Sequence, residues 1–235
     1  MPKQPTIVLV HGALTDASVW NEVAKHLQSL GYTTVAPAIP LRGLHSDAEY
    51  LSAFLKTIEE PFILVGHSYG GSIISHPALG GYQIKALVFV AAFAPDAGES
   101  TGELNGRFPG SKLGEATIVL RECPGGTDLY LQPNHFSDVY AGDLPPNAVA
   151  LMAAAQRPLN VSALSETFDS APTWSSVRSW TVVASADSSL PADAQRFMAK
   201  RAGSIVTEVE ASHALPVSKP SAVAAVIAEA ARTAN

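Results

Sequence analysis

The sequence predicts an α/β fold in which a mostly parallel sheet of about six strands carries helices on both faces. Three observations lead to this prediction. Short β-branched and apolar runs alternate with helix-length segments at both ends of the chain. The first run, Thr6–Val10, has the continuous apolar character of a strand buried on both faces of a parallel sheet. The alternation stops in the middle of the chain, which indicates an insertion.

The first part of the alternation extends to about residue 94. The predicted strands, each a short apolar run, are 6–10, 33–38, 62–65 and 85–93. The predicted helices are 18–30, whose apolar residues fall on one side at helical spacing, 46–59 and 70–76. Gly31 ends the first helix, and Ser46 with Glu49 three residues later has the pattern of a capping box at the start of the second.

Residues 95–172 are rich in glycine, proline, serine and aspartate, and show weak periodicity before 146–156. Such a stretch is too long for a structureless loop in a compact domain, so we predict an inserted, partly helical cap. The alternation then returns as two strands and two helices, at 180–184, 192–201, 205–209 and 221–231. The predicted core therefore comprises 1–94 and 173–235, and the predicted cap or lid comprises 95–172.

Composition narrows the class of protein. A chain of 235 residues with 47% hydrophobic and 15% charged residues is typical of one large globular domain. The net charge of −6 argues against a nucleic-acid partner, because no basic surplus is available to neutralise phosphates. The single cysteine, Cys123, excludes an intrachain disulfide, and the residues before Thr6 lack the pattern of a signal peptide. The longest apolar run, 86–94, is too short to cross a bilayer. We expect a cytoplasmic protein without a membrane partner, and a homodimer is left open.

One motif stands at a strand-to-helix junction. Gly66-His67-Ser68-Tyr69-Gly70 matches G-x-S-x-G directly after a predicted buried strand and before a predicted helix, the context of a nucleophile elbow. The turn is so tight that side chains at positions 66 and 70 would collide with neighbouring elements, and the serine must adopt strained backbone angles. Ser68 is therefore the predicted nucleophile, with Gly66 and Gly70 as the elbow glycines.

A serine hydroxyl needs an adjacent base in order to attack at neutral pH. His213 lies just past the last predicted strand, and loops that follow parallel strands open on one edge of the sheet. Asp187 follows the strand 180–184 and is the predicted acid that orients His213, which gives the chain order Ser, Asp, His. Asp96, after the strand 85–93, is the alternative acid. His11 is expected to be a hydrogen-bonding scaffold residue.

An oxyanion hole completes the predicted site. Its two donors are expected to be the backbone N–H of Tyr69, directly after the nucleophile, and that of Ala13, in the loop after the first strand. Gly12 in the same loop would let the backbone approach the substrate closely. Backbone N–H groups in these positions hold the negative oxygen of a tetrahedral intermediate.

These motifs resemble those of the α/β-hydrolase superfamily over nearly the whole chain. They are His11-Gly12-Ala13, the elbow extended to Gly71, Asp187 within 186–191, and His213. The chain is similar to small bacterial carboxylesterases and to the plant methylesterase and hydroxynitrile-lyase branch. The resemblance implies ester hydrolysis, because hydroxynitrile lyases of this branch carry threonine where this chain has Gly12 and lysine where it has Ala214.

We therefore predict a serine hydrolase that cleaves carboxylic esters of small, mainly apolar or aromatic substrates through an acyl-enzyme, with no cofactor and no metal. The alternatives are a hydroxynitrile lyase or a perhydrolase with the same triad, and a non-catalytic protein of this fold that binds a ligand. The residues expected to line the substrate pocket come from the first loop, the cap and the position after the base: Gly12, Leu14, Phe108, Leu129, Tyr130, Leu131, Phe136, Met152 and Leu215.

Overall fold

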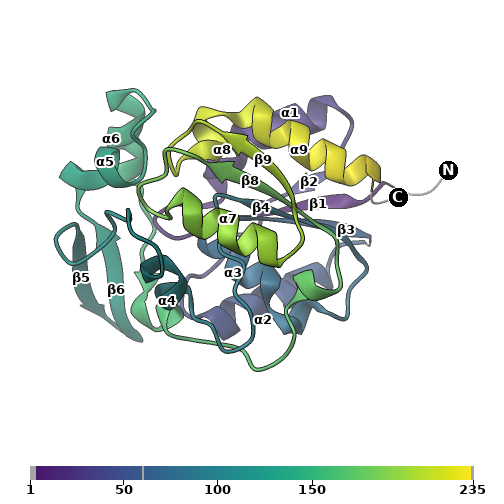
Figure 1. The fold of residues 1–235 in the computed structure, drawn as a ribbon, viewed down its shortest axis with the longest axis horizontal. Helices are drawn as coiled ribbons and strands as arrows, with labels where there is room; N and C mark the ends of the chain where they lie inside the picture. Colours follow the sequence, from purple (N-terminus) through teal and green to yellow (C-terminus); the bar gives the residue numbers. More distant parts are fainter. Residues whose placement is uncertain (1–3, 60, 234–235) are drawn as a thin grey trace.

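A computed structural model describes residues 4–59 and 61–233. Six parallel strands form one sheet in the order β2-β1-β3-β4-β8-β9, which confirms the predicted fold class. Figure 1 shows this sheet at the centre of the molecule with helices above and below it. The strands are β1 (Thr6–Val10), β2 (Thr34–Val35), β3 (Phe62–His67), β4 (Ile84–Val90), β8 (Ser179–Ala184) and β9 (Ile205–Val209).

Two hydrophobic clusters cover the two faces of the sheet, because successive residues of a strand point to opposite sides. Ile7 and Leu9 of β1 pack with the helices of one face, and Val8 and Val10 pack with those of the other. The first face carries α1 (Asn21–Ser29) and α9 (Pro220–Thr233), with the short α8 (Leu215–Ser218) beside them. The second face carries α2 (Leu44–Leu55), α3 (Tyr69–Ser75) and α7 (Ala192–Arg201).

Helix α2 begins earlier than the sequence predicts. Its N-cap is Gly43, so the predicted capping box of Ser46 and Glu49 is wrong. The carboxylate of Glu166 accepts a hydrogen bond of 2.9 Å from the backbone N–H of His45. A free N–H group of the first turn is thus satisfied by a residue distant in the sequence, and Ser46 instead donates its hydroxyl to the carbonyl of Gly43.

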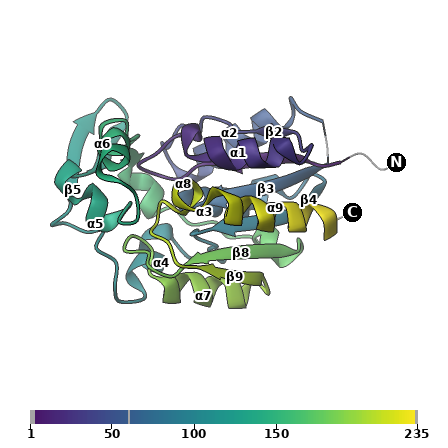
Figure 2. The ribbon, with the colours of Figure 1, turned by 90° about the horizontal axis from the view of Figure 1, so that it is seen from above.

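Residues 118–160, within the chain between β4 and β8, form a separate lobe, which lies opposite the two ends of the chain in Figures 1 and 2. Its centre is an antiparallel sheet in the order β5-β6-β7, which the sequence does not predict. The longer elements between β4 and β8 are α4 (Thr101–Gly106), β5 (Ile118–Cys123), β6 (Gly126–Leu131), α5 (Phe136–Val139), α6 (Pro146–Ala154) and β7 (Leu159–Asn160). The boundaries of the cap at 95 and 172 stay a prediction.

Short 3₁₀ turns connect several elements. They are η1 (Ala17–Trp20), η2 (Pro77–Leu79), η3 (Pro133–His135), η4 (Val161–Leu164) and η5 (Thr173–Ser175). In the part of the chain that the structure describes, no helix combines the length and the apolar character needed to span a bilayer.

Candidate active site

Ser68 lies in the turn between β3 and α3, with backbone angles φ 53° and ψ −124°. Residues other than glycine rarely adopt these left-handed backbone angles. Such strain is found mainly at functional sites, where the surrounding structure holds it in place. A Cβ atom at Gly66 would lie 2.7 Å from the carbonyl carbon of Gly70, and one at Gly70 would overlap the carbonyl oxygen of Val10. Glycine is therefore required at both positions for the turn to close.

Three predicted residues meet at the carboxyl edge of the sheet. The hydroxyl of Ser68 lies 2.8 Å from Nε2 of His213, and Nδ1 of His213 lies 2.6 Å from a carboxylate oxygen of Asp187. All three side chains are buried. The N–H at Nδ1 donates to the carboxylate, which leaves Nε2 free to accept the proton of Ser68. Asp96 instead accepts a hydrogen bond from the neighbouring N–H of Ala97.

The carboxylate of Asp187 is held by further donors. One oxygen accepts the backbone N–H groups of Ser189 and Leu190, at 2.7 and 2.9 Å. The other accepts the side-chain amide of Gln195 on α7 at 2.9 Å. Gln195 is fully buried and also bonds the N–H of Ala184 and the carbonyl of Leu190. Sequence reasoning missed Gln195, although a glutamine on the apolar face of a helix is an available signal.

The backbone on both sides of His213 is anchored to the inserted segment. The carboxylate of Asp143 accepts the hydroxyl of Ser212, and also its backbone N–H at 3.1 Å. The N–H of Ala214 donates to the carbonyl of Tyr140 at 2.9 Å. The aromatic ring of Tyr140 meets the ring of His213 edge to face, with centroids 4.8 Å apart. None of these contacts was anticipated from the sequence.

Two other histidines support the site from below. His67 donates from Nε2 to the carbonyl of His213 at 2.9 Å, and burial holds the pKa of His67 well below its ordinary value. His11 accepts the N–H of Ile39 at Nε2 and donates from Nδ1 to the carbonyl of Gly12. Burial also lowers the pKa of His11. Both rings are therefore neutral at pH 7 and act as fixed hydrogen-bonding parts of the scaffold.

The two predicted oxyanion donors border the same space as Ser68. Tyr69 is the first residue of α3, where a backbone N–H has no partner within the helix. Ala13 lies in the loop after β1. The phenol of Tyr69 donates to the buried carboxylate of Asp47 at 2.9 Å, which anchors the start of α3. Burial raises the pKa of Asp47.

Two adjoining cavities open beside Ser68. The larger, of about 230 Å³, lies between the core and the inserted segment and is mostly apolar. Its lining from the insert includes Leu113, Ile118, Leu129 and Leu159. The smaller, of about 40 Å³, also touches His213. The apolar walls suit an uncharged organic group near the serine.

Of the residues predicted to line the substrate pocket, Leu14 and Leu129 line the cavities beside Ser68, and their contact with a substrate stays a prediction. The prediction is wrong for Tyr130, which points to the opposite side of β6 and lies under the guanidinium of Arg121. It is also wrong for Phe108, whose ring packs against Phe197 with centroids 5.5 Å apart. Phe136 and Leu131 fill the core of the insert itself.

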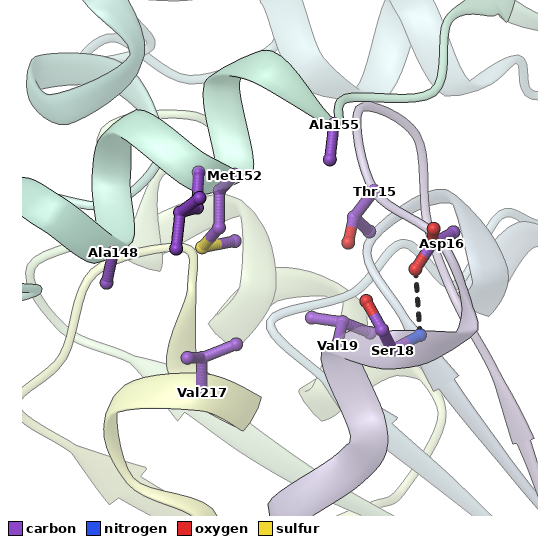
Figure 3. A pocket seen from close by; sticks show the side chains of 9 residues that line it. Thr15, Asp16, Ser18, Val19, Ala148, Met152, Ala155 and Val217 are labelled. Carbon is purple, nitrogen blue, oxygen red and sulfur yellow. Dashed lines mark hydrogen bonds between the residues drawn. The ribbon is translucent and has the colours of Figure 1, made fainter.

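Met152 lies in a different pocket, which Figure 3 shows between α6 and the turn η1. Thr15 and Asp16 line the opposite side of this pocket, and the Asp16 carboxylate accepts the N–H of Ser18 at 2.8 Å. Leu215 packs in the hydrophobic core beneath α8 rather than beside a substrate. Gly12 lines neither of the two cavities beside Ser68. It lies against the serine instead, because a Cβ atom at this position would be 2.7 Å from Cβ of Ser68. These three assignments to the pocket are therefore also corrected.

Comparisons with known proteins agree with this architecture. The model of the Alpha/beta hydrolase family matches residues 7–226. Esterase PIR7B of Oryza sativa subsp. japonica is 29% identical over 91% of this chain and 90% of its own. The putative chloroplastic methylesterase 11 of Arabidopsis thaliana is 27% identical over 96% of this chain and 63% of its own. The crystal structure of polyneuridine aldehyde esterase superposes with a TM-score of 0.81 at 23% identity, covering 97% of this chain and 99% of that one.

Proposed function

This chain belongs to the alpha/beta hydrolase family, and from that membership we propose that it is a carboxylesterase-like serine hydrolase. The observation that carries the proposal is the unbroken hydrogen-bonded series from Ser68 through His213 to Asp187. A serine with a positive φ, a histidine within reach of its hydroxyl and a buried carboxylate on the other ring nitrogen meet the requirements of an activated nucleophile.

In the first step, Ser68 attacks the ester carbonyl carbon while Nε2 of His213 takes the hydroxyl proton. The carbonyl oxygen gains the negative charge and is held by the N–H groups of Ala13 and Tyr69. His213 then passes its proton to the leaving alcohol as the ester C–O bond breaks. Asp187 does not change its protonation; it keeps His213 in the tautomer with the proton on Nδ1 and stabilises the transient imidazolium.

In the second step, His213 takes a proton from water, whose oxygen attacks the acyl carbon of the acyl-enzyme. The bond to Oγ of Ser68 breaks and the proton returns to that oxygen, which releases the carboxylic acid. Apart from the ester and the water, every group that this cycle uses is a side chain or backbone N–H of the chain itself.

The substrates we propose are small, mainly apolar or aromatic carboxylic esters. The larger cavity supports this class because leucine and isoleucine side chains of the insert face Ser68 across it. A hydroxynitrile lyase is disfavoured, because Ala214 follows the proposed base and offers no charge to a leaving cyanide. The relatives named above include an esterase and a putative methylesterase, which also favours ester hydrolysis.

The direct test is the Ser68→Ala variant. We expect turnover of p-nitrophenyl esters to fall by at least about 10⁴-fold, because the nucleophile is removed. A fluorophosphonate probe should label the native protein at Ser68, as located by mass spectrometry, and should not label the variant. An unchanged melting temperature would show that the variant is folded. Wild-type turnover in Ser68→Ala would disprove the proposal, and a native protein that resists labelling would favour a non-catalytic ligand-binding role.

The choice of acid is tested by a matched pair of variants. Asp187→Asn should lower kcat by about 10³- to 10⁴-fold, because an amide favours the wrong histidine tautomer. Asp96→Asn should leave kcat close to wild type, because the carboxylate of Asp96 accepts a hydrogen bond from the adjacent Ala97 and not from His213. The kcat values of the two variants are compared by steady-state kinetics on one aryl ester. The reverse order of effects would move the acid to Asp96.

A further inference from the structure

The smaller cavity beside Ser68 and His213 is bordered by three polar side chains that the catalytic steps above do not use. They are Asn105 on α4, Tyr140 after α5, and Ser189 after β8. Tyr140 and Ser189 are almost completely buried. Among the described residues, Oδ1 of Asn105 and the hydroxyl oxygens of Tyr140 and Ser189 have no hydrogen-bond partner. Buried polar atoms without partners are costly, so three around one small cavity indicate a ligand that pairs with them.

The hydrogen bonds around Asn105 determine which end of its amide is left unpaired. The hydroxyl of Ser111 donates its only hydrogen to the carbonyl of Ser189, at 2.7 Å. Ser111 can therefore only accept from Asn105, which places Nδ2 of that amide toward it at 3.3 Å. Oδ1 is the atom that remains without a partner. Asn105, which borders the cavity, thus carries an oxygen that accepts hydrogen bonds and cannot donate one.

The size and chemistry of this cavity fit a very small molecule with O–H groups. A volume of about 40 Å³ has room for one or two waters, and a buried water needs two to four polar partners. Nε2 of His213, Oδ1 of Asn105 and the two hydroxyls supply that number. The larger cavity also borders Asn105, but it does not border His213, Tyr140 or Ser189 and is mostly apolar.

We propose that Asn105, Tyr140 and Ser189 form an acyl-acceptor site, which positions the water that hydrolyses the acyl-enzyme and favours water over alcohols. The inference rests on the proposed function and concerns only its second step. One O–H of the water donates to Nε2 of His213, and the other donates to Oδ1 of Asn105. A hydroxyl of Tyr140 or Ser189 donates to one lone pair of the water oxygen. The second lone pair forms the new bond to the acyl carbon.

The preference for water follows from counting hydrogens. An alcohol has one O–H, which it must direct to His213 if its oxygen is to attack. Its carbon then faces Oδ1 of Asn105, which stays unpaired in a buried site. Water has a second O–H and satisfies that oxygen. Asn105 is therefore the positioning residue that separates hydrolysis from transfer to an alcohol, whereas the hydroxyl groups assist either acceptor.

The test measures the fate of one acyl-enzyme. Native protein and variants are given p-nitrophenyl butyrate in buffer with added methanol, and the ratio of butyric acid to methyl butyrate is measured by gas chromatography. Both products form from the same intermediate, so the ratio does not depend on the acylation rate or on the fraction of folded protein. Asn105→Leu should shift the ratio toward methyl butyrate by roughly three- to tenfold, the effect of one lost hydrogen bond.

Of Tyr140→Phe and Ser189→Ala, the variant that removes the hydroxyl donating to the water should slow deacylation by a similar factor while changing the product ratio less. This rate is measured after the initial burst of p-nitrophenol. Tyr130→Phe is the matched control, because its phenol lies on the far side of β6, and both quantities should keep their native values.

Native product ratios in Asn105→Leu would overturn the proposal, as would slowed acylation with unchanged deacylation in all three variants. The failure of the proposed function is distinguishable from both outcomes. In that case the native protein itself would form no acyl-enzyme, and Ser68→Ala would retain its turnover.

Discussion

At the scale of single residues, Ser68 is held in a backbone conformation that costs about 1–3 kcal/mol for a residue with a side chain. Its φ of 53° persists because Gly66 and Gly70, two positions away on either side, have no Cβ atoms to block the turn. The carbonyl of Ser68 also accepts the backbone N–H groups of Gly71 and Phe93, at 2.9 and 3.2 Å. The strain is thus fixed by contacts on both sides and points the hydroxyl toward His213.

A substitution at Gly12 tests how closely the loop after β1 packs against Ser68. A Cβ atom at this position would lie 2.7 Å from Cβ of Ser68, so Gly12→Ala must displace one of the two backbones. We expect kcat/KM on aryl esters to fall by about 10- to 100-fold, because small displacements of a nucleophile are costly. Gly81→Ala is the matched control, since a Cβ there meets no atom within 4 Å. Equal kinetics for the two variants would contradict the packing argument.

The sequence could place Ser68, Asp187 and His213 close together, because each lies in the turn or loop that follows a strand and parallel strands end at one edge. It could not place the residues around the cavity. Leu129 and Tyr130 are neighbours in an apolar-looking run, yet only Leu129 faces Ser68. Which of the two points inward depends on the pairing of β6 with β5, and nothing local in the sequence determines that pairing.

At the scale of secondary-structure elements, α7 stabilises the loop that carries Asp187. Gln195 on this helix bonds Ala184 at the end of β8, the carboxylate of Asp187 and the carbonyl of Leu190. Helix, strand and loop are therefore joined by one buried side chain. The position of Asp187 is therefore fixed by the core, which a surface loop alone could not do.

Replacing this amide should affect both stability and catalysis. Gln195→Leu leaves the N–H of Ala184 and the carbonyl of Leu190 buried without their partner, and we expect the free energy of unfolding to fall by about 2–4 kcal/mol. It should also lower kcat with little change in KM, because Asp187 loses one donor. Urea unfolding and steady-state kinetics measure the two effects. The exposed Gln28→Leu serves as control, and native stability in Gln195→Leu would refute the role of this residue.

The elements that the sequence predicts correctly are those bounded by local signals. The bounds of β1, α7 and β9 match the predictions, because proline or glycine stands close to their ends in the sequence. The start of α2 was wrong because its cap comes from Glu166, more than a hundred residues away. The hairpin of β5 and β6 was missed because β5 is largely exposed and lacks alternation. Gly125 and Gly126, both with positive φ, were the available signal for its turn.

At the scale of the whole molecule, buried neutral histidines make stability depend on pH. Burial lowers the pKa of His11, His67 and His76, and that of His76 falls to about 4. The unfolded chain binds protons at these residues near pH 6.5, whereas the folded protein does not. Their contribution to stability is therefore complete above about pH 6.5 and is lost as the pH falls, over the window from 6.5 to about 4 for His76.

We expect the free energy of unfolding to decrease with acidity by up to about 1.4 kcal/mol per pH unit for each of these histidines. His76→Gln should be less stable than the native protein at pH 8 but should show a shallower decline between pH 6.5 and 4. Urea unfolding midpoints at several pH values give both slopes. The exposed His26→Gln should keep the native slope, and a native slope in His76→Gln would rule out this origin of the pH dependence.

The attachment of the His213 loop to Asp143 and Tyr140 bears on attempts to redesign this protein. Exchanging the whole lobe for one from another esterase, in the hope of new selectivity, would also remove the supports of His213, the proposed base. Such a chimera should bind its new esters and turn them over poorly until those two supports are rebuilt. Point substitutions within the native lobe, at Ile118 or Leu159 for instance, leave the supports in place and are the safer route to altered selectivity.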